Sequence, residues 1–376
     1  MRLAFVCFYE AYPPASGAAS VTFNTAKHAG CEAIIVQLMA RSQPERIADG
    51  VRVITLPCWS DSRVRKLAAL QGTIRRITAV LECLAPDVVV LQGASWALYH
   101  LLMLRRIRRR LPQARVAYHA HNVEYVLRKQ KHGRLVTAIT RSAEGRVLRE
   151  ADLCFAVSDV DAHQFENLYG IRPKLLPNGV DCERFDRVTP DQIRAMRQKY
   201  SLGDRTVLFM GLYAYRPNRE GADFLVESVM PQVVRQCPDT KLVIIGGEVP
   251  YERPWLINPG RIPYEEVAPA VQACRVGVAP VFSGSGTRLK ILEYLAGSRA
   301  VVSTAKGAEG LDLQNGRDLL LAEDADAFSS AIVRLLQDRA LAESLGANGQ
   351  RVVNARYAWP VLMQAFRETV FGASRV

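Results

Sequence analysis

Short apolar runs alternate with segments of helical spacing along the whole chain of 376 residues. In the first half the runs occupy residues 2–8, 32–38, 51–56, 87–91, 115–119 and 152–157. In the second half they occupy residues 206–210, 241–245, 276–281 and 300–304. Runs of this length that are rich in branched residues are typical of buried strands, and the segments between them are typical of helices. The pattern predicts an α/β protein with parallel, doubly wound sheets.

The alternation restarts in the middle of the chain, which is too long for one comfortable hydrophobic core. Residues 177–181 (Pro-Asn-Gly-Val-Asp), with the polar residues that follow to about Thr189, are typical of a linker between domains. We therefore expect an N-terminal domain over residues 1–185 and a second domain over residues 186–355. A last helix within residues 356–376 should complete the fold.

The composition limits location and metal content. No apolar run approaches the roughly 20 residues that a membrane helix needs. Glu10 directly follows the first apolar run, which favours a strand over a signal peptide. The eight cysteines are scattered, without a Cys-x-x-Cys pair or a His and Cys cluster at zinc spacing. We therefore expect a cytoplasmic protein without a structural metal.

The net charge of +12 is concentrated in the first half. Residues 1–185 hold 26 Lys and Arg against 16 Asp and Glu, a net +10, and the remaining residues hold 23 against 21, a net +2. This difference suggests that the first half faces an anionic partner, either a membrane surface or a nucleic acid. The sequence has neither aromatic residues interleaved with these basic residues nor a known nucleic-acid-binding module, so we expect no nucleic acid as a partner.

Two basic segments contribute to this charge. Between Trp59 and Glu82, five basic residues share a helical pattern: Arg63, Arg65, Lys66, Arg75 and Arg76. This segment is either an amphipathic helix on an anionic membrane, with Trp59 at the interface, or a surface helix with solvated charges. The run Arg105–Arg110 ends a predicted helix, where cations are favourable in any case.

The stretch Ser283–Glu293, which reads Ser-Gly-Ser-Gly-Thr-Arg-Leu-Lys-Ile-Leu-Glu, carries the strongest chemical signal. Its glycines, Gly284 and Gly286, lie between a predicted strand and a predicted helix, where backbone can approach a ligand and a helix N-terminus favours an anion. Arg288 and Lys290 oppose the dipole of that helix, and an anion is a reason for their presence. Two interpretations stay open: a site for a sugar attached to a diphosphate, with Glu293 accepting from ligand hydroxyls, or an ordinary loop with solvated charges.

Two further loops follow predicted strands of the first half, where α/β domains bind ligands. The loop of small residues around Gly17 lacks the Gly-x-Gly-x-x-Gly fingerprint of a dinucleotide site. His121 follows the strand at 115–119 and is either a base, a hydrogen-bond partner of a sugar hydroxyl, or a structural residue. His119 and His121 should point to opposite faces of an extended segment, which argues against a metal site.

Together these motifs resemble those of the retaining glycosyltransferases of family 4, and the resemblance spans nearly the whole chain. It is carried by the Gly17 loop, by Ser158 and by residues 121–124, 177–181, 283–293, 299–304 and 307–311. The resemblance implies the GT-B fold, in which two Rossmann-like doubly wound domains face a central cleft and the C-terminal helix packs back on the N-terminal domain. It also implies a nucleotide-diphosphate sugar as co-substrate, bound mainly by the second domain, without a metal or another cofactor.

The resemblance further implies roles for single residues. The donor would be bound by Arg216, Gly284, Ser285, Gly286, Thr287, Arg288, Lys290 and Glu293. Among these, the backbone amides of 284–287 would face the diphosphate or the sugar, and Glu293 would take the ribose hydroxyls. His121 would contact the donor sugar or orient the acceptor, within an acceptor and sugar loop that also contains Gly17, Ala18, Asn122 and Glu124.

Two departures from the family pattern qualify this prediction. Many members have a carboxylate eight residues before Glu293, where this chain has Ser285. The usual Arg and Lys after Gly211 are also out of register, and Arg216 is the nearest substitute.

We predict a retaining transfer of a sugar to a hydroxyl of a lipid-linked or glycan acceptor, in polysaccharide or glycolipid biosynthesis at the inner face of the cell membrane. The alternatives are an epimerase of the same fold that acts on the nucleotide sugar itself, and a non-catalytic subunit that binds a sugar nucleotide. The second alternative is motivated by Ser285.

Overall fold

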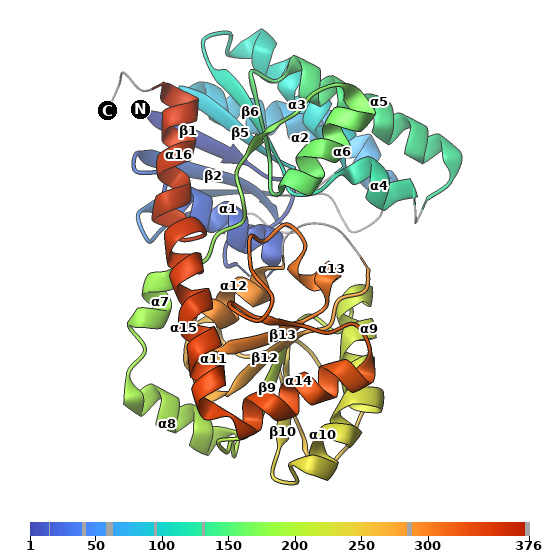
Figure 1. The fold of residues 1–376 in the computed structure, drawn as a ribbon. Coiled ribbons are helices and arrows are strands. Elements are labelled where there is room, and N and C mark those ends of the chain that lie inside the picture. Colours follow the sequence, from blue (N-terminus) through green and yellow to red (C-terminus); the bar gives the residue numbers. More distant parts are fainter. Residues whose placement is uncertain are drawn as a thin grey trace. The chain divides into compact units, whose positions relative to one another are not determined.

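The computed structural model describes residues 1–14, 16–39, 43–57, 63–93, 96–129, 132–283 and 288–372, without the side chains of residues 63–68. The chain forms two compact units (Figure 1). The first unit comprises Met1–Asn178 together with Trp359–Val376, and the second comprises Gly179–Ala358.

The division after Asn178 comes earlier than the predicted boundary at residue 185. The reason is α7 (Cys182–Asp186), which packs on two helices of the second unit, α11 (Tyr264–Ala273) and α12 (Leu289–Ala296). Phe185 and Val180 belong to the hydrophobic core of that unit. The segment that we expected to be a linker is therefore part of the second unit.

The first unit contains one sheet with the strand order β3-β4-β2-β1-β5-β6-β7-β8. The strands are β1 (Arg2–Val6), β2 (Glu32–Met39), β3 (Gln43–Ala48), β4 (Val51–Pro57), β5 (Val88–Gly93), β6 (Arg115–Ala120), β7 (Leu153–Ala156) and β8 (Lys174–Leu175). All neighbours are parallel except β3 and β4. The pattern of apolar runs did not predict β3, because this edge strand is mostly exposed and has a polar sequence.

Helices cover both faces of this sheet, which explains why its central strands are apolar throughout. One face packs on α2 (Arg63–Leu84), α3 (Ala97–Arg110) and α5 (Arg134–Glu150). The opposite face carries α1 (Gly17–Lys27) and the C-terminal helix α16 (Trp359–Phe371), which lie side by side in Figure 1. Phe366 of α16 contacts Phe155 of β7 with ring centroids 5.2 Å apart. The predicted packing of the C-terminal helix on the N-terminal domain is confirmed.

The second unit contains a parallel sheet with the order β11-β10-β9-β12-β13-β14. Its strands are β9 (Thr206–Met210), β10 (Lys241–Ile245), β11 (Leu256–Gly260), β12 (Val276–Ala279), β13 (Ala300–Ser303) and β14 (Leu320–Leu321). On one face lie α7, α8 (Pro190–Lys199), α11, α12 and α15 (Arg339–Arg356). On the other lie α9 (Arg216–Phe224), a π-helix at Leu225–Val229, α10 (Met230–Gln236) and α14 (Ala325–Gln337). The predicted α/β class with two doubly wound domains is confirmed.

Tyr294 holds α12 in place beneath this sheet. Its buried hydroxyl accepts a hydrogen bond from Met210 N at 2.8 Å and donates to Val278 O at 3.4 Å. Its ring lies against Gly277, where an added Cβ would be 2.4 Å from the ring. Only glycine permits this approach, and the contact sets the position of α12 relative to β9 and β12.

Candidate active site

The candidate site of the second unit lies at the carboxyl ends of β9 and β12, which are neighbours in the sheet. Because β9 is flanked by β10 and β12, the strand order reverses there, and ligands of open α/β sheets bind at such a point. The loop after β9 begins at Gly211, and the loop after β12 leads to Arg288 and α12. Four predicted donor-binding residues, Gly284, Ser285, Gly286 and Thr287, lie outside the described residues.

Lys290 is half-buried, and its ammonium points back toward the loop after β9. Its Nζ donates to Asn218 Oδ1 at 3.0 Å and lies 4.0 Å from the ring centroid of Phe209. Burial, with a further contribution from the charge of Arg288, lowers the pKa of Lys290 to about 7. A lysine whose pKa is lowered to near 7 by its surroundings is typical of a site that binds an anion or transfers a proton.

Glu293 lies one turn after Lys290 and is paired with Arg184 of α7. The distance from Arg184 Nη2 to Glu293 Oε1 is 3.2 Å. Burial raises the pKa of Glu293, whereas Arg184 and Lys290 oppose this rise. The structure thus shows two basic residues beside this carboxylate, and sequence analysis had identified only Lys290.

Arg184 is held by aromatic rings as well as by this ion pair. Its guanidinium carbon lies 4.3 Å from the ring centroid of Tyr264 and 5.0 Å from that of Phe185. Its side chain is 14% exposed, and its Nε and Nη1 atoms are buried without a hydrogen-bond partner among the described residues. No sequence signal pointed to Arg184, because its partner is 109 residues away in the chain.

Arg216 and Arg288 differ in their surroundings. Arg216, at the start of α9, is 75% exposed and donates from Nε to Glu220 Oε1 at 2.7 Å. Glu220 also accepts from Ser283 Oγ at 2.9 Å, so that it links α9 to the loop after β12. Arg288 is the N-cap residue of α12 and donates from Nη2 to Ser283 O at 3.3 Å.

Thr304 connects the loop at 307–311 to the same edge of the sheet. Its hydroxyl donates to Val281 O at 2.6 Å and accepts from Gly307 N at 3.0 Å, which caps α13 (Ala305–Ala308). Gly307 is therefore tied through Thr304 to Val281, which follows β12.

In the first unit, His121 lies just beyond the carboxyl end of β6. Its Nε2 donates to Gln92 Oε1 at 2.6 Å, and His119 Nδ1 donates to the same oxygen at 3.2 Å. The expectation that the two rings point to opposite faces is wrong, because side chains two positions apart in an extended segment lie on the same face, and the rings lie 4.9 Å apart. Sequence analysis did not identify Gln92, whose amide orients both rings.

The protonation state of His121 follows from this arrangement. Burial, followed by the charges of His119 and His100, lowers the pKa of His121 well below its usual value. Since Gln92 Oε1 can only accept, the proton of the neutral ring is on Nε2, and Nδ1 is left as an acceptor. His121 can therefore accept a hydrogen bond from a hydroxyl.

Glu124 has structural partners in this fold. One carboxylate oxygen accepts from Ala97 N, at the start of α3, and the other accepts from Arg128 Nε, both at 2.5 Å. The backbone N–H of Glu124 donates to Glu144, a buried residue whose pKa is raised by burial to about 7. Asn122 is half-buried in the loop between His121 and Glu124.

The Gly17 loop follows β1, whose neighbours are β2 and β5 on either side. Gly17 is exposed and Ala18 half-buried at the start of α1, which is capped by Ser16. The buried side chain of Gln37 orders the preceding backbone, since its Oε1 accepts from Ala11 N and Tyr12 N at 2.8 Å each. Ser158 similarly caps α6 (Asp159–Tyr169), with Oγ accepting from Asp161 N at 3.1 Å.

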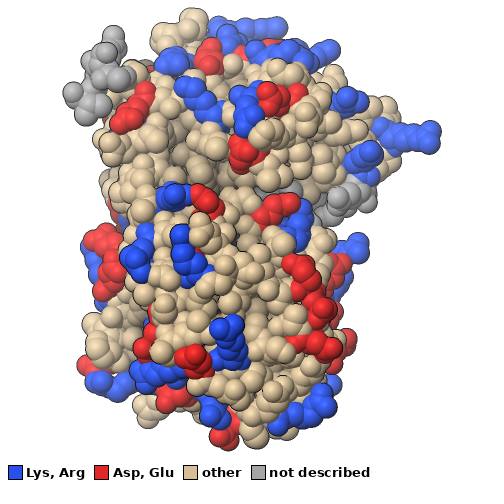
Figure 2. All heavy atoms as spheres, in the orientation of Figure 1, with Lys and Arg blue, Asp and Glu red and all other residues tan. Residues whose placement is uncertain are grey.

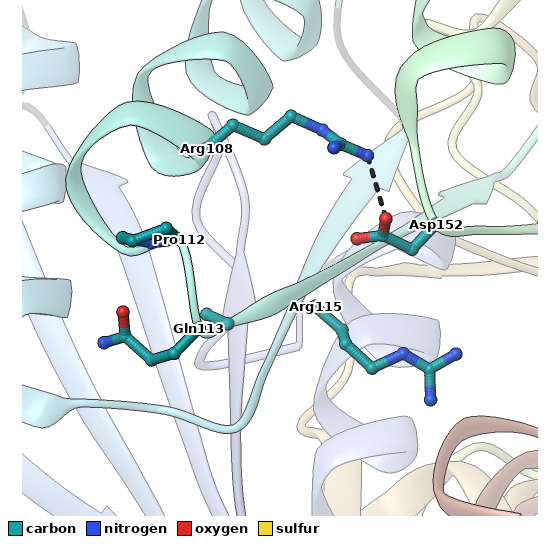
Figure 3. Close-up of a pocket in the computed structure, with 6 residues that line it drawn as sticks. Arg108, Pro112, Gln113, Arg115 and Asp152 are labelled. Carbon is teal, nitrogen blue, oxygen red and sulfur yellow. Dashed lines mark hydrogen bonds and ion pairs between the residues drawn. The ribbon is translucent and has the colours of Figure 1, made fainter.

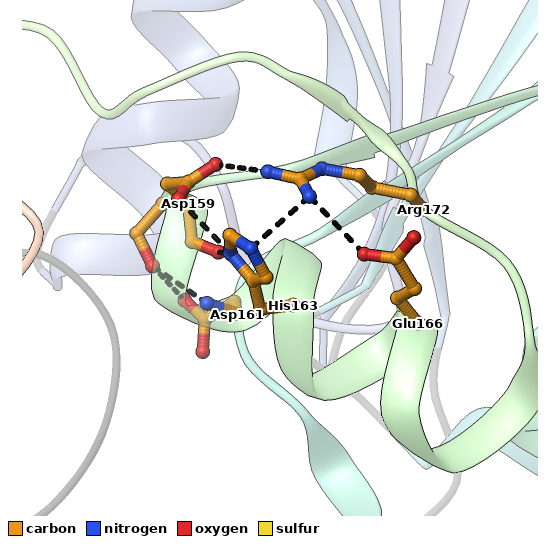
Figure 4. A network of polar contacts seen from close by, with 6 residues as sticks. Asp159, Asp161, His163, Glu166 and Arg172 are labelled. Carbon is orange, nitrogen blue, oxygen red and sulfur yellow. Dashed lines mark hydrogen bonds and ion pairs between the residues drawn. The ribbon is translucent and has the colours of Figure 1, made fainter.

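Two other polar features of the first unit have ordinary explanations. A pocket of about 530 Å³ at the amino end of β6 is crossed by the bond from Arg108 to Asp152, at 2.8 Å (Figure 3). Arg172, which follows α6, pairs with Asp159 and Glu166 of that helix and contacts its His163 (Figure 4). These side chains are about half exposed, and solvated ion pairs of this kind contribute little to stability.

The basic helix α2 differs from the amphipathic membrane helix that we considered. Its apolar residues Leu70, Ile74, Ile77 and Leu81 are buried in the core of the first unit, so this face is not available to a bilayer. Arg75 and Arg76 remain exposed, and Figure 2 shows further Lys and Arg side chains over the first unit. Trp59 and the side chains of Arg63, Arg65 and Lys66 lie outside the described residues.

In the described part of the chain, no helix combines the length and the apolar composition that a membrane span requires. Within the same residues, no group of three or more His, Cys, Asp and Glu side chains is arranged to hold a metal ion.

Comparison with known proteins now gives the family. A family model described as Glycosyltransferase Family 4 matches residues 15–184, and one described as Glycosyl transferases group 1 matches residues 204–338. A GDP-mannose-dependent alpha-(1-6)-phosphatidylinositol monomannoside mannosyltransferase of Mycolicibacterium smegmatis is 30% identical over 287 residues, which cover 69% of this chain and 70% of that protein. A GDP-mannose-dependent monoacylated alpha-(1-6)-phosphatidylinositol monomannoside mannosyltransferase of Corynebacterium glutamicum is 25% identical over 244 residues, or 59% of this chain and 63% of that protein.

Solved structures agree on the fold. Sucrose-phosphate synthase from Thermosynechococcus elongatus has a TM-score of 0.80 at 18% identity, with 100% of both chains covered. WaaG, a glycosyltransferase involved in lipopolysaccharide biosynthesis, has a TM-score of 0.71 at 15% identity, with 97% of this chain and 98% of that chain covered. The fold and the matched families define a glycosyltransferase of the GT-B type. The chain belongs to glycosyltransferase family 4.

A first prediction concerns the pH dependence of stability at Lys290. Because its folded pKa of about 7 is below that of an unfolded lysine, the unfolded state binds more protons between pH 7 and about 10. The free energy of unfolding of wild type, relative to Lys290→Met, should therefore rise with pH over this window, by at most about 1.4 kcal/mol per pH unit. Below pH 7 the difference should be constant, with the variant the more stable protein.

Urea unfolding of both proteins at several pH values measures this difference. Lys306→Met is the matched control, since Lys306 pairs with Glu309 at the surface. A Lys290→Met profile that runs parallel to wild type from pH 6 to 10 would contradict the buried placement of this ammonium.

Proposed function

We propose that this protein transfers a hexosyl group from a nucleotide-diphosphate sugar to a hydroxyl of a glycolipid or glycan acceptor, with retention of the anomeric configuration. The observation that carries the proposal is the convergence of Arg288, Lys290 and Glu293 at the carboxyl ends of β9 and β12. The mannosyltransferase names of the two relatives make GDP-mannose the first donor to test and a lipid-linked mannoside the first acceptor.

Arg288 and Lys290 would stabilise the leaving group. The bond between the sugar C1 and the phosphate oxygen breaks, its electron pair stays on the nucleoside diphosphate, and the acceptor oxygen bonds to C1 from the same face. The acceptor proton passes to the departing phosphate oxygen. Two cations beside that oxygen favour the charge that develops on it, so we infer that transfer needs no metal ion.

Lys290 would also compensate for the absence of the family's Arg and Lys after Gly211. Its ammonium contacts Asn218, in the segment after β9 where the family pattern has its Arg and Lys. In this proposal Lys290 replaces their charge from the neighbouring helix. Arg216 is exposed and bound to Glu220, and it would be a weaker contributor.

Glu293 would accept hydrogen bonds from the two ribose hydroxyls, which requires an ionised carboxylate. Burial favours the neutral acid, and the guanidinium of Arg184 opposes that effect at a distance of 3.2 Å. His121, neutral and with Nδ1 as an acceptor, would bind a hydroxyl of the donor sugar or of the acceptor. Glu124 would act indirectly, because its carboxylate supports α3 and the loop after β6.

The direct test is an incubation with GDP-mannose, other nucleotide sugars and a lipid-linked mannoside, with the product analysed by mass spectrometry and NMR. We expect a new α-linked product from an α-linked donor, at the same rate with and without EDTA. Arg288→Ala and Lys290→Ala should each weaken nucleoside diphosphate binding by about 1.5–3 kcal/mol, and leave binding of the bare nucleoside nearly unchanged.

Other outcomes would favour the rival functions. Isomerised free donor without a transfer product would indicate an epimerase. Donor binding without hydrolysis or transfer would indicate a non-catalytic subunit, in agreement with Ser285 in place of a carboxylate. Unchanged diphosphate affinity in both variants would remove Arg288 and Lys290 from the site.

A separate prediction concerns Arg184 and Glu293. Arg184→Met should raise the pKa of Glu293 further, so that the affinity for a ribonucleoside diphosphate falls toward low pH earlier than in wild type. Below the raised pKa, binding should resemble that of Glu293→Gln, and a dideoxyribose analogue should be insensitive to either change. Calorimetry from pH 5 to 8 measures this, with Arg187→Met on the same helix end as control, since Arg187 is 74% exposed. Equal losses for the ribose and dideoxyribose ligands would point to a structural role for the pair.

We further propose that the basic residues of α2 dock the protein on an anionic membrane by charge alone. The apolar face of α2 is buried, but each Lys or Arg near such a surface contributes about 1 kcal/mol, within a Debye length. Wild type should therefore co-sediment with anionic liposomes at low salt and dissociate at high salt.

The test variant changes Arg63, Arg65, Lys66, Arg75 and Arg76 to Gln. Its control loses the same charge from exposed arginines of the second unit: Arg187, Arg194, Arg235, Arg253 and Arg334. We expect loss of binding in the first variant alone. If both variants lose binding equally, the effect is one of total charge and α2 is not the docking surface.

A further inference from the structure

A second basic site lies in the second unit, at the edge of the sheet opposite the candidate active site. It is a pocket of about 310 Å³ whose charged lining residues are Arg197, Asp204, Arg275, Arg299, Arg339 and Glu343. Arg275 directly precedes β12 and Arg299 directly precedes β13, so the pocket is at the amino ends of these strands. The loop to Arg288 follows the carboxyl end of β12, and nothing in the proposed transfer involves this pocket.

The charges in this pocket do not balance. Four arginines face two carboxylates, which leaves two positive charges. Arg197 Nη1 pairs with Asp204 Oδ1 at 3.1 Å, and Arg339 Nε pairs with Glu343 Oε1 at 2.6 Å. Both carboxylates therefore already have an arginine partner.

Among the arginines of this pocket, Arg275 and Arg299 have no carboxylate within ion-pair distance in the described part of the chain. Arg275 donates from Nε to Asp204 O at 3.3 Å. Arg299 donates from Nε to Gly297 O at 2.9 Å and from Nη1 to Cys274 O at 3.3 Å. Backbone carbonyls orient these guanidinium groups but do not neutralise them.

The excess of positive charge affects the pKa of Arg299. Burial, together with the positive charges of Arg275 and Arg197, lowers the pKa of Arg299. Cys274 and Glu343 oppose this lowering only in part. Like charges gathered in a half-buried pocket repel one another, and a bound anion would reduce the repulsion. In the pocket of the first unit, Arg108 pairs with Asp152 (Figure 3), and one arginine, Arg115, has only a backbone carbonyl as its partner, Val370 O at 2.5 Å. The pocket of the second unit has two such arginines.

We propose that this pocket binds the phosphate group of a small phosphorylated metabolite. Two excess positive charges match a phosphate dianion, and the planar guanidinium fork matches the geometry of its oxygens. A volume of about 310 Å³ lies at the lower end of the range of small-molecule sites, and has room for more than the phosphate itself. Inorganic phosphate and a hexose 6-phosphate present the same group, and the test compares them.

The experiment is a calorimetric titration of the full chain with inorganic phosphate and with mannose 6-phosphate, in excess nucleoside diphosphate so that the candidate active site is blocked. Arg275→Gln should weaken binding of both ligands by about tenfold or more, the loss expected for one charge-assisted contact. Tighter binding of mannose 6-phosphate would identify a monoester as the ligand, and equal binding would identify free phosphate. Either result supports the site.

The matched control is Arg235→Gln, since Arg235 is exposed on α10 and also donates its Nε to a backbone carbonyl, Pro231 O at 3.2 Å. Nucleoside diphosphate affinity, measured on each variant, reports whether the second unit is folded and is independent of sugar transfer. Wild-type affinity for both phosphates in Arg275→Gln overturns the proposal. An equal loss of affinity in Arg235→Gln also overturns it. The same holds if titration of wild type with sodium chloride, at the same ionic strength, gives a binding signal equal to that of phosphate.

Discussion

The contact between Tyr294 and Gly277 determines the geometry of the candidate active site. Because the ring lies directly against the strand and its hydroxyl bonds to β9 and β12, the first turn of α12 has one position relative to the sheet. Lys290 and Glu293 are on that turn and the next, so their positions depend on this contact. A side chain on residue 277 would displace the helix that carries both charges.

Burial of the charges of Lys290 and Glu293 is energetically unfavourable, and their partners come from different parts of the second unit. Lys290 reaches Asn218 and Phe209, Glu293 reaches Arg184, and Glu220 joins Arg216 to Ser283. In contrast, the ion pairs between Arg172 and α6 in Figure 4 are solvated and contribute little to the free energy of unfolding. Burial with an incomplete set of partners is what distinguishes a site for an anionic ligand from a surface network.

The first unit has mainly uncharged amide and imidazole groups at the corresponding edge of its sheet. Gln92 orients His119 and His121, and Gln37 orders the loop after β1. The carboxylate of Glu124 supports the start of α3 and is paired with Arg128. Arg75 and Arg76 of α2 are on the surface, because the apolar side of the helix is needed for the core.

The amino-acid pattern was sufficient to predict the α/β class, the two-domain organisation and the helix that follows Arg288, because these features depend on local periodicity. The pattern did not predict β3 or β11, since β3 is an exposed polar edge strand and β11 contains both Pro259 and Gly260. The folded structure was needed to show that Arg184 pairs with Glu293, that His119 and His121 share Gln92, and that Arg275 and Arg299 line one pocket. Each of these depends on contacts between residues that are distant in the chain. The spacing of residues along one segment contains no information about such contacts.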